Sequence, residues 1–397
     1  MHGTPGSPAR MRPAGGGAPR NESVQPHNTA PADGGFAALL ERAAQEILAV
    51  TYWFEPAPQL EPYPVTIRFT GRRADVKGKL QRRDRFVHDE TIAEVVPGSG
   101  PISITARVRD INPGEWEVTA TALGSTLPAR GRQEVASVLP AASPQGPTIW
   151  LWRKWAASVE AAHHAKTCPA PFARVPGALP LIWGAMVTLG MVVALAVQSL
   201  VIAHDHLRVG PVWAWTLIAI AVGIAGAKVW YIVKHRRAHR FEGWCIQGFI
   251  TGASLAAAVL FTVFHAPTGI VLDATAPGLM LGMAVGRVGC FLAGCCGGPP
   301  TAARWGVWSS DQRVGARRVP TQLLESAFSL SLGLALLVAV LGRGPAGGAY
   351  FVAALAAYTL MREGLLRLRA EPLRTAGPMS AVVSALVLIA AIVVLVR

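Results

Sequence analysis

The sequence predicts a mainly α-helical, polytopic membrane protein with a small soluble all-β, sandwich-like domain at its amino-terminal end. Of its 397 residues, 51% are hydrophobic and 15% are charged. After about Pro176, seven apolar stretches each have about the 20 residues that a helix needs to cross a bilayer. Before that point, apolar and polar residues alternate with the period of a β-strand. The alternative, a soluble protein in which these helices are buried, is disfavoured. The sequence between the seven stretches contains too few polar residues to shield them from water.

The seven predicted spans follow one another closely. They run over residues 178–203, 211–233, 244–265, 271–289, 321–342, 347–365 and 377–396. The fourth is the weakest, because it is short and is interrupted by Asp273 and Pro277. The formal net charge of +14 comes from 37 Lys and Arg against 23 Asp and Glu, and the basic residues lie largely in loops beside spans. Anionic lipid head groups, rather than nucleic acid, are therefore the expected partner.

The amino-terminal part changes its periodicity along the chain. Apolar residues recur at helical spacing from Phe36 to Leu48, and a period of two follows from Thr51 to about Leu123. Mixed Trp and basic residues at 149–155 are typical of a helix at the membrane surface. The expected segments are a disordered tail (1–34), a soluble β-rich domain (35–125), a linker with an interfacial helix (126–176) and a seven-span membrane domain (177–397).

Basic residues in short loops predict the orientation of a membrane protein. The loops after the second, fourth and sixth predicted spans carry most of them, and residues 234–240 alone hold four. By parity these loops share a side with the amino-terminal domain, and no cleavable signal peptide is visible in the first 35 residues. We therefore expect the amino-terminal domain in the cytoplasm.

One segment has unusual chemistry for its predicted depth in the membrane. Residues 286–298 read Gly-Arg-Val-Gly-Cys-Phe-Leu-Ala-Gly-Cys-Cys-Gly-Gly, with one arginine, five glycines and three cysteines. An arginine near hydrocarbon costs about 3 kcal/mol by the lower estimates, so it is rarely there without a partner or an anionic ligand. Glycines allow a ligand or another backbone to come close. The segment therefore predicts a site, with Arg287 as its charged group.

Separated motifs resemble the prolipoprotein diacylglyceryl transferase family of bacterial membranes. In chain order they are Ile182–Gly184, Gly226–Lys228, Asp273–Pro277, Gly282, Gly286–Gly289, Gly298–Thr301, Trp305–Val307, Pro320–Glu325 and Tyr358–Arg362. The resemblance covers residues 178–397 and leaves the amino-terminal domain unexplained. It implies a transferase in the bacterial plasma (inner) membrane that moves diacylglyceryl from phosphatidylglycerol to a lipoprotein signal-sequence cysteine. It also implies an active face at the outer surface, in conflict with the loop charges.

The chemistry of that reaction suggests roles for several matching residues. Negative charge develops on the leaving glycerol phosphate, so cations must face it. Arg287 and Arg362 are expected to hold the phosphate, since the planar fork of arginine suits it, and Glu325 and Gln322 to orient them. The alternative for each is a structural ion pair between helices. The glycines expected to admit the head group are Gly286, Gly289 and Gly298.

The chain departs from the family pattern where the acceptor thiol would be handled. Trp183 stands where the family usually has a tyrosine, and Gln247 where it has a histidine. A glutamine cannot accept the proton of a thiol. Cys290 replaces an asparagine, while Cys295 and Leu366 replace glutamates. We expect Trp183 and Gln247 to line the substrate site and Cys290 and Cys295 to be catalytic candidates.

The cysteines leave several kinds of chemistry open. By the resemblance, Cys245, Cys290, Cys295 and Cys296 would face one cavity. Four thiols could bind a soft metal, form a redox disulfide or carry a group covalently, or they could pack as small apolar residues. The family reaction requires no metal and no organic cofactor, and none is expected here. The rival functions are a thiol-dependent lipid-processing enzyme and a non-catalytic lipid-binding scaffold.

Overall fold

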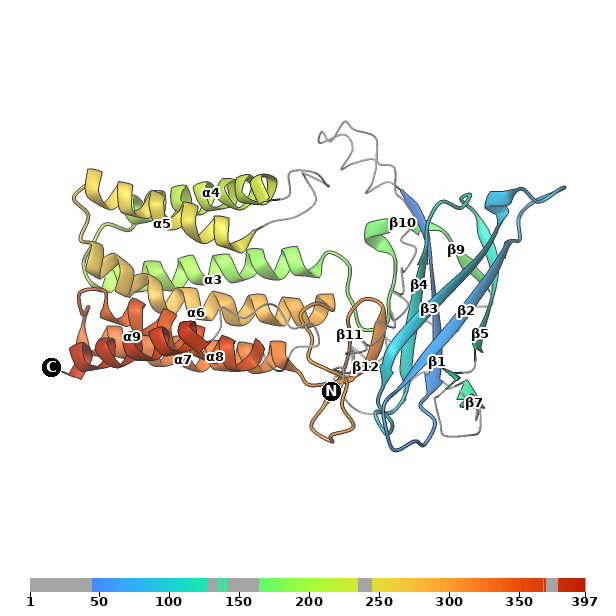
Figure 1. Cartoon of the computed structure of the whole chain (residues 1–397). Helices are drawn as coiled ribbons and strands as arrows, with labels where there is room; N and C mark the ends of the chain where they lie inside the picture. Colours follow the sequence, from blue (N-terminus) through green and yellow to red (C-terminus); the bar gives the residue numbers. More distant parts are fainter. Residues whose placement is uncertain are drawn as a thin grey trace, which may run out of the picture.

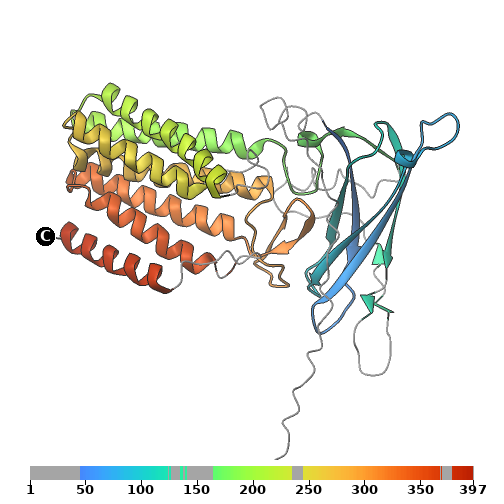
Figure 2. The same cartoon turned by 45° about the horizontal axis from the view of Figure 1, so that its top comes forward.

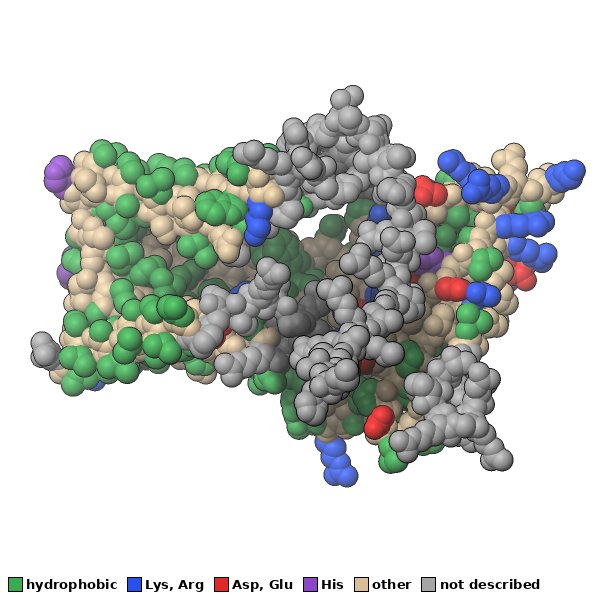
Figure 3. Space-filling model, viewed as in Figure 1, with side chains coloured by type: hydrophobic (Ala, Val, Ile, Leu, Met, Phe, Trp, Pro, Cys, Tyr) green, Lys and Arg blue, Asp and Glu red, His purple; other side chains and the backbone are tan. Residues whose placement is uncertain are grey.

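The computed structural model describes residues 45–123, 125–126, 135–136, 139–140, 164–234, 245–366, 368 and 378–396. Long helices form one end of the molecule and β-sheets form the other, with a small hairpin between them (Figures 1 and 2). In Figure 3, hydrophobic side chains cover much of the helical end, whereas Lys, Arg, Asp and Glu gather on the β end. An apolar surface suits contact with lipid and a charged surface suits contact with water, so the helical end has the surface of a membrane part and the β end that of a water-facing part.

Seven long helices make up the bundle within the described residues. They are α3 (Ile182–His204), α4 (Val209–Lys234), α5 (Ile246–Val263), α6 (Thr268–Ala293), α7 (Thr321–Arg343), α8 (Ala349–Leu366) and α9 (Pro378–Val396). Each coincides with one predicted span to within a few residues. Five of them, α3, α4, α6, α7 and α9, are long and apolar enough to cross a membrane. Crossing by α5 and α8, each of 18 residues, stays a prediction.

Small residues let the helix backbones approach closely in two helix pairs, α3 with α6 and α4 with α5. A Cβ added at Gly190 of α3 would lie 2.6 Å from the carbonyl oxygen of Gly282 in α6. A Cβ at Gly226 of α4 would lie 2.5 Å from the carbonyl oxygen of Gly248 in α5. Such contacts between small residues drive helix association in lipid, where no hydrophobic force is available.

The charged residue of the weakest predicted span has a structural task. Asp273 is fully buried in α6, which accommodates Pro277 and extends beyond the predicted span at both ends. Its carboxylate accepts hydrogen bonds from the backbone N–H groups of Ala346 at 2.7 Å, Gly348 at 2.9 Å and Tyr350 at 3.0 Å. Ala346 and Gly348 lie in the loop that leads into α8, and Tyr350 lies in its first turn, where N–H groups have no partner within the helix. Asp273 thus joins α6 to α8.

Two packed sheets form the β end. The first has the order β10-β1-β4-β12-β11 with β8 also paired to β1, and the second has the order β3-β2-β5-β9. Buried residues from both sheets share one core, with Phe54 and Ile104 on one side and Ile67, Phe69 and Trp116 on the other. The sandwich-like arrangement agrees with the predicted fold class. The strands of these two sheets are β1 (Glu46–Glu55), β2 (Tyr63–Arg73), β3 (Arg85–Val95), β4 (Ile102–Val108), β5 (Glu115–Leu123), β8 (Leu139–Pro140), β9 (His164–Lys166), β10 (Cys168–Pro169), β11 (Val307–Ser310) and β12 (Val314–Arg318). A separate two-stranded pair is formed by β6 (Ser125–Thr126) and β7 (Val135–Ala136).

Two local expectations for this part need correction. The predicted helix over Phe36–Leu48 is wrong at its end, because Ile47 and Leu48 lie in β1 and pair with β10 and β4. Pairing with partner strands outweighs the helical spacing of their side chains there. The strands β9 and β10 also lie in the range expected as a linker. The predicted tail, residues 36–44 of that helix and the interfacial helix at 149–155 lie outside the described residues.

A hairpin between α6 and α7 attaches the β end to the bundle. Its strands β11 and β12 pair with each other, and β12 pairs with β4 at Val314↔Ile104. The indole of Trp308 stacks on Trp53 with 5.4 Å between ring centroids, and its Nε1 donates to the Pro101 carbonyl at 3.0 Å. The β end is thereby fixed where α6 ends and α7 begins.

Candidate active site

Four side chains from three helices meet around one carboxylate. Arg287 comes from α6, Glu325 from α7, and Tyr358 and Arg362 from α8. Nη2 of Arg287 lies 2.7 Å and Nη1 of Arg362 lies 3.1 Å from Oε1 of Glu325. The Tyr358 hydroxyl donates to the same oxygen and accepts from Arg287 at 3.2 Å. Tyr358 and Arg362 share a helix face because they are four residues apart.

The cluster carries excess positive charge in a largely enclosed place. The side chain of Glu325 is 1% exposed, that of Arg287 15% and that of Arg362 32%. Two guanidinium groups and one carboxylate leave a net charge of +1. A buried charge without compensation is costly, so this arrangement suits an anionic ligand that reaches the arginines from the exposed side.

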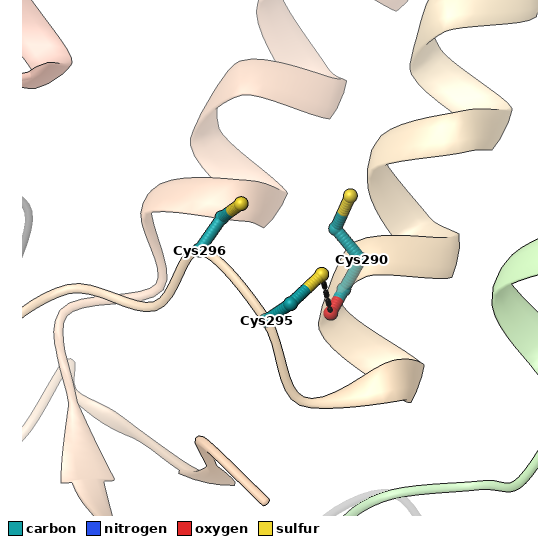
Figure 4. A group of neighbouring side chains, drawn as sticks. All are labelled: Cys290, Cys295 and Cys296. Atoms are coloured by element: carbon teal, nitrogen blue, oxygen red, sulfur yellow. Dashed lines mark hydrogen bonds between the residues drawn. The ribbon is translucent and has the colours of Figure 1, made fainter. Parts of the chain in front are cut away.

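Three thiols lie beside this cluster, at the end of α6. Cys290 belongs to the last turn of the helix, which ends at Gly294 in the left-handed conformation with φ 69°. Cys295 and Cys296 follow directly, and the sulfur atoms of all three lie within 4.8 Å of one another (Figure 4). Cys290 Sγ is 4.0 Å from Nη1 of Arg287, so the thiols adjoin the guanidinium. The grouping includes three of the four cysteines expected to converge, without Cys245.

Groups near the start of α7 hold the turn that carries these thiols. Nε2 of Gln322 donates to the Cys295 carbonyl at 2.8 Å, and the Thr321 hydroxyl donates to the Cys296 carbonyl at 3.1 Å. Gln322 was expected to orient an arginine, and its hydrogen bond is to the cysteine turn. Its Oε1 is buried and has no hydrogen-bond partner in the described part of the chain.

The three glycines of the predicted site differ in their surroundings. A Cβ at Gly286 would meet nothing within 4 Å, so this position borders open space. A Cβ at Gly289 would lie 2.6 Å from Cβ of Met186, and one at Gly298 would lie 2.4 Å from the Val319 carbonyl oxygen. Gly289 and Gly298 therefore permit packing, and Gly286 has room for a ligand.

Two further predicted site residues lie apart from the cluster. Trp183 is in the first turn of α3, and its side chain is 52% exposed. Gln247 is exposed at the start of α5 and accepts a long contact from Cys245 Sγ at 3.9 Å. Within the described residues, neither side chain has a hydrogen bond to Arg287, Glu325 or Arg362.

Sequence reasoning gave no role in the site to two residues that belong to this region. Tyr358 connects both arginines to Glu325, and its place four residues before Arg362 was the available signal. Arg318 is 4% exposed, donates to the Gly298 carbonyl at 3.3 Å and pairs with Asp311 at 2.7 Å. It fixes the loop that follows the cysteines, and nothing in the local sequence marks it as buried.

Comparison with known proteins gives a consistent result for the helical part. The model of the family described as prolipoprotein diacylglyceryl transferase matches residues 174–397. A phosphatidylglycerol–prolipoprotein diacylglyceryl transferase of Dehalococcoides mccartyi strain BAV1 is 31% identical over 185 residues, which are 41% of this chain and 68% of the relative. Enzymes of the same name from Clostridium perfringens strain 13 (32% over 135 residues, 31% and 53% of the two chains) and Nostoc sp. strain PCC 7120 (34% over 149 residues, 34% and 52%) are also similar. The chain therefore belongs to the prolipoprotein diacylglyceryl transferase family.

Proposed function

We propose that the protein transfers a diacylglyceryl group from phosphatidylglycerol to the thiol of a lipoprotein signal-sequence cysteine. The observation that carries the proposal is the buried cluster of Arg287, Arg362, Tyr358 and Glu325 with its net charge of +1. The phosphodiester of phosphatidylglycerol carries one negative charge, which this excess would balance. The names of the relatives give the same reaction for those proteins.

The cluster would act on the leaving group. The acceptor thiol loses its proton to water, its sulfur attacks the glyceryl carbon, a C–S bond forms, and the C–O bond to phosphate breaks. The electron pair of that bond leaves on glycerol phosphate, where charge rises from one to two negative units. Arg287 and Arg362 oppose this rise, and preorganised donors of this kind contribute most in a water-poor site. Glu325 holds both guanidinium groups in place.

The remaining site residues would take supporting roles. Gly286 leaves room for the head group because no atom lies within 4 Å of its missing Cβ. Gly289 and Gly298 allow the packing that fixes the loop, and Gln322 holds the Cys295 carbonyl. Trp183 and Gln247 would line the path by which lipid or peptide enters. Cys290, whose Sγ lies 4.0 Å from Nη1 of Arg287, and the neighbouring Cys295 would be the groups nearest to an incoming thiol.

A direct assay tests the proposal. Purified protein is mixed with phosphatidylglycerol and a peptide that contains a lipoprotein signal-sequence cysteine. Mass spectrometry should find the peptide heavier by one diacylglyceryl group, with release of glycerol phosphate. Arg287→Ala should lower the rate about 100- to 1,000-fold, and Arg343→Ala, at the opposite end of α7, should not change it. Unmodified peptide in the presence of folded protein would reject this function.

We also propose that all seven helices cross the bacterial plasma membrane with the amino-terminal domain in the cytoplasm. The support is the basic hairpin between α6 and α7, whose Arg313 and Arg317 lie on the side of the β end. A reporter enzyme that is active only outside the cytoplasm should work when fused to Arg397 and fail when fused to Met1. The reverse result would place the β end and the cluster outside.

A further inference from the structure

We propose that Cys290, Cys295 and Cys296 form a zinc site of three thiolates with one open position, which the acceptor thiol occupies as a thiolate. The site has a task in the proposed function, on which the acceptor part of this inference rests. Zinc suits the donor set, since thiolates are soft ligands and prefer such an ion. Three protein ligands plus one exchangeable position is the arrangement of catalytic zinc.

The distances fit with small side-chain rotations. The three sulfur atoms lie within 4.8 Å of one another. In a tetrahedral site, Zn–S bonds of about 2.3 Å separate two sulfurs by about 3.8 Å. The three side chains point into one space between the end of α6 and the following turn (Figure 4). Closing the sulfurs onto one ion therefore requires shifts of about 1 Å and no change of fold.

Packing alone does not account for the group. Cys290 is buried, Cys295 is half-buried and Cys296 is exposed, so the sulfurs form a path from the interior to the surface. Packing in the interior as a small apolar side chain could explain the buried Cys290 but not the exposed Cys296. A disulfide would use two of the sulfurs and leave the third unexplained, and the adjacent pair Cys295–Cys296 is too short for an unstrained bridge. A metal ion uses all three.

The surroundings of the thiols support a built site. Gln322 and Thr321 fix the carbonyls of Cys295 and Cys296, and hydrogen bonds of this kind position metal ligands. The Oε1 of the same Gln322 side chain is buried and has no hydrogen-bond partner among the described residues. Arg287 lies 4.0 Å from Cys290 Sγ, so a cation is next to a group that would carry net negative charge with zinc bound.

The site would supply the deprotonation that the acceptor needs, because a thiol is a poor nucleophile until it becomes a thiolate. A thiol that coordinates zinc is deprotonated outright, and its proton passes to water. The bound sulfur then attacks the glyceryl carbon, and the electron pair of the broken C–O bond leaves on glycerol phosphate beside Arg287. Zinc returns to its three thiolates when the thioether product leaves.

Metal binding can be tested without the transfer assay. Protein purified in detergent with a reductant is stripped with a chelator and titrated with Zn²⁺ or with Co²⁺ as a coloured probe. One ion should bind per chain, and Co²⁺ should give a strong sulfur-to-cobalt charge-transfer band in the near ultraviolet. Zn²⁺ should also protect three thiols from maleimide. Serine at Cys290, Cys295 or Cys296 should weaken binding by more than the roughly 10- to 100-fold expected for loss of a supporting hydrogen bond.

Two cysteines outside the group provide matched controls. Cys168→Ser and Cys245→Ser should leave the affinity for Zn²⁺ and the Co²⁺ spectrum unchanged. Absence of saturable binding by the reduced wild type, or equal binding by all three serine variants, would overturn the site. A Cys290–Cys295 disulfide whose reduction restores no binding would do the same.

The inference and the proposed function fail in different ways. Transfer at full rate after removal of the metal would overturn the use of zinc to hold the acceptor thiol and leave the proposed function standing. Bound Zn²⁺ without any transfer would retain the site but overturn its use for the acceptor thiol. In the presence of signal peptide, the Co²⁺ band should change intensity as a fourth sulfur binds, and a serine-for-cysteine peptide should not cause this change.

Discussion

At the scale of single residues, the shape of Arg287 is as important as its charge. Its Nη2 contacts Glu325 at 2.7 Å and Tyr358 at 3.2 Å, while its Nη1 lies 4.0 Å from Cys290 Sγ, and the single ammonium of a lysine cannot reach in both directions. Arg287→Lys should therefore lower the transfer rate about 100-fold while the thermal midpoint changes little. Initial rates and thermal unfolding in detergent measure both. Arg343→Lys is the control, and an unchanged rate for Arg287→Lys would show that charge alone suffices.

Loss of the carboxylate should act differently from loss of an arginine. Glu325→Gln would leave two enclosed guanidinium groups without a counter-charge, and breaking a buried pair in this way costs about 3–5 kcal/mol. We expect a lowered thermal midpoint together with lost activity. Excess phosphatidylglycerol should raise the midpoint again, because its phosphate supplies the missing negative charge. A midpoint equal to that of the wild type would contradict the balance of charge described for this cluster.

Gly286 and Gly289 are expected to have different roles: the first leaves room for a ligand and the second allows close packing between helices. Gly286→Ala adds a methyl group where no atom lies within 4 Å, whereas Gly289→Ala places it 2.6 Å from Cβ of Met186. The first change should raise the KM for phosphatidylglycerol with little effect on stability. The second should cost about 1–3 kcal/mol of stability through overpacking. Similar unfolding midpoints for the two variants would refute this distinction.

At the scale of elements, the hairpin between α6 and α7 depends on one close contact with the β end. A Cβ at Gly315 would lie 2.4 Å from both Ser103 Oγ and the Trp308 ring. Gly315→Val should therefore detach β12 from β4, speed limited proteolysis near Arg313 and reduce activity, because Arg318 in the same strand holds the Gly298 carbonyl. Gly342→Val, with open space around its Cβ position, is the control. An unchanged cleavage rate would show that the strand pairing does not hold the hairpin.

The sequence predicted those elements whose signal is local. Seven apolar runs of about 20 residues located all seven helices, and Arg287 and Glu325 stood out because charge within such runs is rare. The hairpin was missed because Val314 pairs with Ile104, far away along the chain. The same holds for Tyr358, whose role depends on three helices meeting. Ile47 and Leu48 were assigned to a helix because their spacing fits both a helix and a strand with two buried faces.

At the scale of the whole molecule, the two ends should respond differently to acid. Asp84 in the β end is buried, and its carboxylate accepts from Asn112 Nδ2 at 2.8 Å, from the Gln81 N–H at 2.9 Å and from Arg73 at 3.4 Å. These hydrogen bonds, first that of Asn112, hold the pKa of Asp84 below its usual value. Because the pKa is lower in the folded state, the stabilisation is complete above the unfolded pKa of about 3.9 and is lost as pH falls through the folded value.

Below about pH 4, the β end should therefore unfold before the helical bundle, in which the apolar helices are held by lipid or detergent. Near-ultraviolet circular dichroism should report the loss of packing around Trp116 and Trp53, while the far-ultraviolet helical signal persists. Asp84→Asn should be less stable than the wild type at neutral pH and should lose less on acidification, since it has no carboxylate to protonate. Simultaneous loss of both signals would mean that the β4–β12 pairing and the stack of Trp53 on Trp308 couple the two ends into one cooperative unit. In that case Trp308→Ala should separate the two unfolding transitions. The pH difference between them in this variant would then show how strongly the contact between Trp308 and Trp53 couples the unfolding of the β end to that of the helical bundle.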